Sequence, residues 1–156
     1  VRAVRFNLYR GGSAAFSELE ALAQRVYDLV RWHVELYVDT QHLGDMLPVL
    51  MRLPQVSIDH LGLTQAGFTD LLRLVEHGAC VKATRFAVLE FDVGVAMRTI
   101  YDVNPNSLMF GTDLPGTRAP RCFHADDLHL LRDTFNHAEL DRVMYANAMA
   151  LYHSDY

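Results

Sequence analysis

Ionisable and hydrogen-bonding side chains follow five stretches of this 156-residue sequence that have the pattern of β-strands. Strand by strand these polar residues are Arg5 and Asn7, Tyr37 and Asp39, Asp59 and His60, Lys82 and Arg85, and Asp113. The carboxyl ends of parallel strands meet at one edge of a sheet, so we expect these side chains to share one face. A carboxylate there can move a proton, and guanidinium groups can hold an anion.

Each of these residues also has a purely structural interpretation. His60 could be a satisfied structural histidine, and Asp113 could cap a turn after Gly-Thr. Arg5 could be one half of a surface ion pair, and Tyr37 could pack within the sheet. Lys82 and Arg85 could be solvated. It is the gathering of polar groups at all five strand ends that favours a functional site.

The elements that would position these residues alternate regularly along the chain. Alternating or continuous apolar patterns predict strands over 1–8, 33–39, 56–59, 79–84 and 107–110. Apolar spacings of three and four predict helices over 15–30, 45–53, 64–77, 92–104, 125–135 and 137–152. We expect Asp92 to cap the fourth helix and Gly78 to follow the third. Strict strand–helix alternation predicts an α/β fold with right-handed βαβ units and a parallel sheet.

Two architectures accommodate five parallel strands. The length of 156 residues favours a doubly wound open sheet over part of a (β/α)₈ barrel, which usually needs about 250 residues. Neither a G-x-G-x-x-G fingerprint nor a Walker-type loop follows the first strand, so nucleotide binding is not indicated. Gly11 and Gly12 predict only a turn.

Composition excludes several classes of protein. The chain is 51% hydrophobic and 21% charged, with a formal net charge of −5, as in an ordinary globular domain. Its 14 basic residues are scattered, so nucleic acid is not an expected partner, and no apolar run is long enough to span a membrane. Cys80 and Cys122 form no disulfide framework, which favours the cytoplasm. Because the first residue is Val1, we expect the chain to begin inside a longer product, after processing, or by design.

Two motifs resemble the amidohydrolase superfamily: Ile-Asp-His-Leu-Gly at 58–62 and Met-Phe-Gly-Thr-Asp-Leu-Pro at 109–115. The likeness is closest to the amidohydrolase-2 branch that contains 2-pyrone-4,6-dicarboxylate lactonase. It extends over nearly the whole chain, through residues 1–7, 32–39, 81–84 and 147–152. The resemblance implies a single partial domain over 1–156, holding strands four to eight of a TIM-type (β/α)₈ barrel, with the first three strands missing. It therefore reverses the length argument for an open sheet.

The resemblance also assigns expected roles. His60 matches the histidine of strand six, and Asp113 matches the aspartate of strand eight that activates the attacking water. Tyr37 stands where metal-dependent members commonly have a histidine. Substrate-binding positions are matched by Arg5 with Asn7, by Tyr37 and by Arg85. The family's His-x-His pair is absent from these 156 residues, and Leu63 stands where the lactonases have an arginine.

These matches imply a hydrolase that acts on a lactone or amide bond of a small anionic compound. The cofactor would be none or one divalent metal, zinc or manganese, and His60 and Asp113 would be ligands if a metal is bound. Two alternatives stay open: a metal-dependent decarboxylase of the same superfamily, and a non-catalytic half-barrel. Exposed sheet edges would favour a homo-oligomer in the latter case.

Overall fold

The computed structural model describes residues 2–116 and 118–153. Five short strands carry the sheet: β1 (Ala3–Asn7), β2 (His33–Tyr37), β3 (Val56–Ile58), β4 (Cys80–Ala83) and β5 (Leu108–Phe110). The α-helices are α1 (Phe16–Val30), α2 (Leu43–Leu50), α3 (Phe68–Glu76), α4 (Val93–Val103), α5 (Ala125–Thr134), α6 (His137–Asp141) and α7 (Asn147–Tyr152). The predicted alternation of strands and helices is confirmed.

All five strands are parallel, and they lie in the order in which they occur in the chain, β1-β2-β3-β4-β5. Arg5 pairs with Glu35 across the first two strands, and Lys82 pairs with Met109 across the last two. A sequential parallel order places all the carboxyl ends of the strands along one edge. Each strand therefore ends beside the next, as a site built from strand ends requires.

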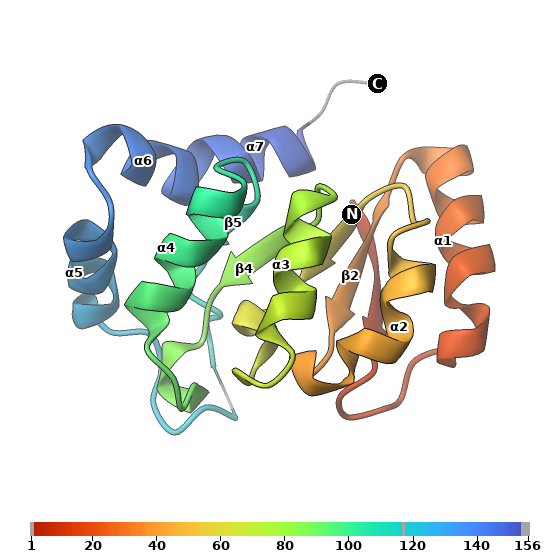
Figure 1. Ribbon diagram of the computed structural model, residues 1–156, viewed down its shortest axis with the longest axis horizontal. Helices are drawn as coiled ribbons and strands as arrows, with labels where there is room; N and C mark the ends of the chain where they lie inside the picture. The colour runs from red at the N-terminus through yellow and green to blue at the C-terminus, as the bar shows by residue number, and fades with distance from the viewer. Residues whose placement is uncertain (1, 117, 154–156) are drawn as a thin grey trace.

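One face of the sheet is covered by helices. Figure 1 shows α2, α3 and α4 in front of the strands, with α1 and α5 at the two sides. Val34 and Leu36 of β2, and Ile58 of β3, point into the layer between sheet and helices, and each is at most 1% exposed. Burial of these apolar side chains supplies the main driving force for joining sheet and helices. The alternate residues of each strand lie on the opposite face.

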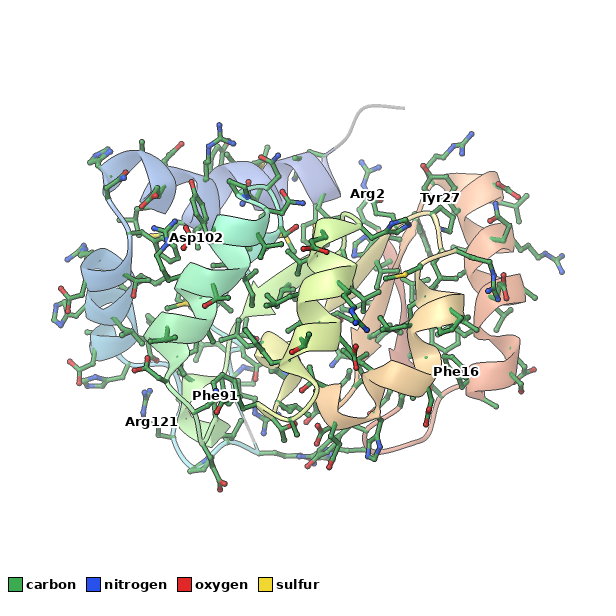
Figure 2. All side chains as sticks on the ribbon, viewed as in Figure 1. Arg2, Phe16, Tyr27, Phe91, Asp102 and Arg121 are labelled. Carbon is green, nitrogen blue, oxygen red and sulfur yellow. The ribbon has the colours of Figure 1, made fainter. Side chains whose placement is uncertain are left out.

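The C-terminal segment crosses the sheet at the end where the strands begin. Figure 1 places α6 and α7 across the top, and Figure 2 labels Arg2, just before β1, near the same end. A π-helical turn, Arg142–Ala146, joins the two helices. The Asn147 side-chain amide donates to the backbone oxygens of Pro105 and Leu108, each at 2.8 Å. These bonds fix the last helix to the amino end of β5 and leave the carboxyl ends of the strands uncovered by it.

The second and third predicted helices have different bounds in the structure. The second runs from Leu43 to Leu50 instead of 45–53, which places Pro48 inside the helix. The third begins at Phe68 instead of residue 64, because the preceding segment is held against η1 (Thr40–His42), where the Thr40 hydroxyl donates to the Thr64 backbone oxygen at 2.6 Å. A Cβ at Gly67, which has a φ of 75°, would lie 2.0 Å from the Thr40 backbone oxygen. Tertiary contacts therefore override the helical pattern here.

Two predicted helix ends are confirmed. Asp92 accepts a hydrogen bond from the Val95 backbone N–H at 2.9 Å, and Gly78 follows α3 with a φ of 98°.

None of the helices in the part of the chain that the structure describes is long and apolar enough to cross a membrane.

Candidate functional site at the carboxyl ends of the strands

Three consecutive strand ends share an unusual backbone conformation. His60 after β3, Arg85 after β4 and Asp113 after β5 have φ values of 53°, 62° and 54°, in the left-handed region. This region costs about 1 kcal/mol or more for most residues with a Cβ and less for aspartate, and backbone strain often concentrates at functional sites. In each case the chain turns sharply as it leaves the strand. The turn directs the side chain over the sheet edge.

These residues line a common cleft with a volume of about 300 Å³, which we call the strand-end cleft. Its lining consists of Arg5, Tyr37, His60, Arg85, Asp113, Leu114, Pro115, Gly116 and Arg118. A second cavity of about 590 Å³ shares Tyr37, Arg85 and Arg118 with it. Phe91, which lines the second cavity, is labelled at the lower end of the molecule in Figure 2, opposite Arg2. Four of the five strands therefore contribute through the residue at or just after their carboxyl end, and β1 contributes through Arg5.

His60 is held from two sides. Its side chain is buried, its Nδ1 lies 2.6 Å from the Thr84 hydroxyl oxygen, and the Tyr37 ring meets its imidazole edge-on at a centroid distance of 5.2 Å. Burial lowers the pKa of His60 to about 4; neighbouring Asp113 raises it, and the cation of Arg85 lowers it further. The imidazole is therefore neutral near pH 7. A neutral imidazole presents one N–H donor and one acceptor nitrogen.

Asp113 and Arg85 face each other across the cleft. The Asp113 side chain is 34% exposed, and one of its carboxylate oxygens lies 3.8 Å from Arg85 Nε. The Arg85 side chain is only 10% exposed, yet its Nε has no hydrogen-bond partner among the residues described. A buried N–H group without a hydrogen-bond partner is costly. Because Arg85 also lines the cleft, its positive charge is available to an anion bound there.

Four charged residues form a row across β1 to β4, which we call the charge row: Arg5, Glu35, Asp59 and Lys82. Glu35 pairs with both Arg5 and Lys82. Asp59 also contacts both cations, with Oδ2 at 2.6 Å from Arg5 Nη2 and Oδ1 at 3.3 Å from Lys82 Nζ. The interpretation of Lys82 as a solvated side chain is wrong, since it is 17% exposed and bound by two carboxylates.

Burial and the neighbouring charges within the charge row shift the pKa values of its two carboxylates in opposite directions. Burial alone would raise the pKa of Glu35, but Lys82 and Arg5 outweigh it and leave the pKa of Glu35 below its usual value. Burial raises the pKa of Asp59 despite the attraction of Lys82. For Lys82, burial lowers the pKa, and Asp59 and Glu35 together outweigh it and raise it. With two cations and two anions, the row is neutral overall when all four are charged.

The structure brings together five of the six residues expected at the site: Arg5, Tyr37, His60, Arg85 and Asp113 line the strand-end cleft. Asn7 is not among the lining residues, and its side-chain oxygen accepts the Arg10 backbone N–H at 2.9 Å in the turn after β1. Sequence reasoning missed the contact between Thr84 and His60. Alternation indicates only that Thr84, just after β4 and two residues after Lys82, faces the same side as Lys82; it does not indicate which residue Thr84 meets.

The same residues can be tested as a metal site. His60 and Asp113 are the two expected ligands, and His60 Nδ1 is already engaged by Thr84. Over residues 2–116 and 118–153, no group of three or more histidine, cysteine, aspartate or glutamate side chains is placed to hold a metal ion. A catalytic zinc usually has three protein ligands. The described residues alone therefore do not fit a zinc site, and we derive no chemical step through a metal.

The sequence of this chain identifies its family. The family model described as amidohydrolase (Amidohydro_2) matches residues 1–153, and the chain belongs to this family. The predicted membership of the amidohydrolase superfamily is confirmed by this match; the narrower likeness to the lactonase branch stays a prediction. Among curated proteins, no match to this chain was found.

Two solved structures share the fold. One is the ligand-free structure of ATU3138 from Agrobacterium tumefaciens, with a TM-score of 0.78 and 24% identity over 96% of this chain. The other is amidohydrolase 2 from Bifidobacterium longum subsp. infantis, with a TM-score of 0.70 and 24% identity over 99% of this chain. The chain spans 60% and 62% of the lengths of these two proteins. The predicted fold, five parallel β/α units of a TIM-type barrel, is confirmed.

Proposed function

We propose that this protein contributes the catalytic strand ends of a hydrolase that cleaves a lactone or amide bond in a small carboxylated compound. The observation that carries the proposal is the convergence of Asp113, His60 and Arg85 on one cleft from three neighbouring strands. A base, a neutral imidazole that can donate a hydrogen bond, and a cation that lines the cleft are three groups that such a hydrolysis can use.

The proposed reaction begins with a water molecule beside Asp113. The carboxylate accepts a proton as the water oxygen attacks the carbonyl carbon, which creates an oxyanion. The His60 imidazole donates a hydrogen bond to this developing negative charge. Asp113 then returns its proton to the leaving oxygen or nitrogen as the bond to carbon breaks. Atoms and charge balance, and the residue ends in the carboxylate form in which it began.

Substrate anchoring falls to Arg85 in this proposal. The Arg85 side chain lines both cavities, and its Nε lies 3.8 Å from the nearest carboxylate oxygen of Asp113, beyond hydrogen-bond distance, so the guanidinium has capacity for a substrate carboxylate. Arg5 has less capacity, because Glu35 and Asp59 already hold both ends of its guanidinium. A substrate carboxylate near Arg5 would compete with two protein carboxylates. We therefore propose that Arg5 shapes the cleft more than it attracts the anion.

The experiment that tests the function compares Asp113→Asn with wild type on a panel of carboxylated lactones and amides. We expect turnover to fall by at least about 100-fold while KM changes less than threefold, since the carboxylate acts in the proton transfers. Asp133→Asn, which alters an exposed aspartate on α5, is the matched control and should leave both constants unchanged.

Two results would overturn the proposal. Wild-type turnover in Asp113→Asn would remove this residue from the mechanism. Release of carbon dioxide in place of hydrolysis products, dependent on added zinc or manganese, would instead support the decarboxylase alternative.

A further inference from the structure

The contact between Thr84 and His60 restricts which nitrogen of the imidazole carries the proton. The two residues lie just after neighbouring strands, Thr84 after β4 and His60 after β3, and they are 7% and 5% exposed, respectively. Their 2.6 Å contact, between the Thr84 hydroxyl and His60 Nδ1, permits two arrangements. Either the hydroxyl donates to a bare Nδ1, or it accepts from a protonated Nδ1 and must place its own proton elsewhere.

The surroundings favour the first arrangement. In the part of the chain that the structure describes, His60 Nδ1 is the one hydrogen-bond partner found for the Thr84 hydroxyl. A buried hydroxyl proton without an acceptor is costly, so the hydroxyl gains most by donating to Nδ1. The neutral imidazole then carries its proton on Nε2. The arrangement therefore leaves His60 with a single N–H donor, on the side of the ring away from Thr84.

The threonine itself is held in place by close packing. A Cβ at Gly111 would lie 3.0 Å from the Thr84 methyl carbon, tighter than ordinary van der Waals contact. The absence of a side chain at Gly111 therefore lets β5 approach the methyl group. The imidazole of His60, in turn, packs against the Tyr37 ring. Thr84 and His60 thus lie together between Tyr37 of β2 and Gly111, which follows β5.

We propose that Thr84 is a positioning residue that fixes His60 as an Nε2–H hydrogen-bond donor toward the strand-end cleft. Its catalytic meaning rests on the proposed function, in which His60 donates to the oxyanion. The tautomer itself does not depend on that function. A histidine with the proton on Nδ1 would present a bare Nε2 to the cleft, and a lone pair there would repel a developing negative charge.

The first test measures the tautomer directly, without any substrate. Nitrogen-15 NMR of the histidine rings in the wild-type protein at pH 7.5 should show His60 with a protonated Nε2 and a bare Nδ1. The His60→Asn variant identifies the signals by their loss. A proton on Nδ1 in the wild-type protein would overturn the proposal, whether or not the protein turns out to be a hydrolase.

The second test removes the hydroxyl at constant shape. In Thr84→Val we expect the Nε2–H signal of His60 to be replaced by the signals of a mixture of tautomers. Turnover should fall by about tenfold, which is the change in rate expected for the loss of one buried hydrogen bond. KM should change less than threefold. Thr84→Ser keeps the hydroxyl, so it should retain both the wild-type tautomer and turnover within threefold.

The two variants separate positioning from packing. Loss of the Nε2–H signature in Thr84→Ser as well as in Thr84→Val would assign the effect to packing of the methyl group and overturn the proposal. An unchanged tautomer in Thr84→Val would do the same. Absence of hydrolysis in the wild-type protein would defeat the proposed function and leave the NMR result to decide the role of Thr84.

Discussion

The two faces of the sheet are formed by the same strands but are held together by different interactions. On the helix-covered face, Val34 and Leu36 are buried among other apolar side chains of the core. On the opposite face of the same strand, His33, Glu35 and Tyr37 meet an aromatic ring, two cations and an imidazole. Apolar packing tolerates many side chains of similar volume, whereas a charge row requires particular partners. Alternation along one strand thus separates stability from chemistry.

The largest expected effect lies on the helix-covered face. Leu36→Ala removes a fully buried side chain and leaves a cavity, so we expect the free energy of unfolding to fall by about 3 kcal/mol. Urea denaturation monitored by circular dichroism measures this change. If Leu36→Ala loses less stability than a substitution in the charge row, the proposed division between the two faces is wrong.

The charge row should respond more weakly, and in a way that depends on pairing. Lys82→Met leaves two close carboxylates facing one remaining cation, Arg5, so we expect a loss of about 2 kcal/mol in the same assay. Adding Glu35→Met restores the balance of one cation and one anion, and should recover part of the loss.

The control for the charge row is an exposed ion pair. Arg52→Met breaks the surface contacts of Arg52 with Glu20 and with the Pro48 backbone oxygen, where we expect a smaller loss of stability than in Lys82→Met. If the double variant Lys82→Met/Glu35→Met is less stable than Lys82→Met alone, the charge row stabilises the fold by something other than charge balance.

The smallest expected effect concerns pH. Burial lowers the pKa of His33 to about 4, from an ordinary value of 6.5, and its Nε2 has no hydrogen-bond partner in residues 2–116 and 118–153. The unfolded chain therefore binds a proton more readily, and the contribution of His33 to stability is full above pH 6.5 and is lost as the pH falls toward 4. We expect His33 by itself to lower the free energy of unfolding by about 1–2 kcal/mol at pH 5 relative to pH 7.5.

The variant His33→Phe tests this assignment by urea denaturation at the two pH values. It removes the titrating group and keeps an aromatic ring beside Tyr152, so the difference in stability between pH 7.5 and pH 5 should become smaller than in the wild-type protein. An equal difference in both proteins would place the acid sensitivity elsewhere.

The sequence predicted the element order and the gathering of polar groups at strand ends because both depend on local patterns. The charge row was not predicted, since Arg5 and Glu35 meet only through the register of β1 against β2, which no single segment encodes. The same holds for Thr84 and His60, which lie 24 residues apart. The start of α3 was missed because Thr40 binds the segment before it. Local propensity decides the elements, whereas pairing across strands decides the contacts within the site.

The left-handed turns at His60, Arg85 and Asp113 have a consequence for anyone who would redesign this cleft. Asparagine, aspartate and glycine enter that backbone region readily, whereas β-branched residues resist it. A library built at these three positions would therefore be filtered by main-chain geometry before any new chemistry is selected. Broad variation is better directed at a neighbour such as Leu114, which lines the cleft without that constraint.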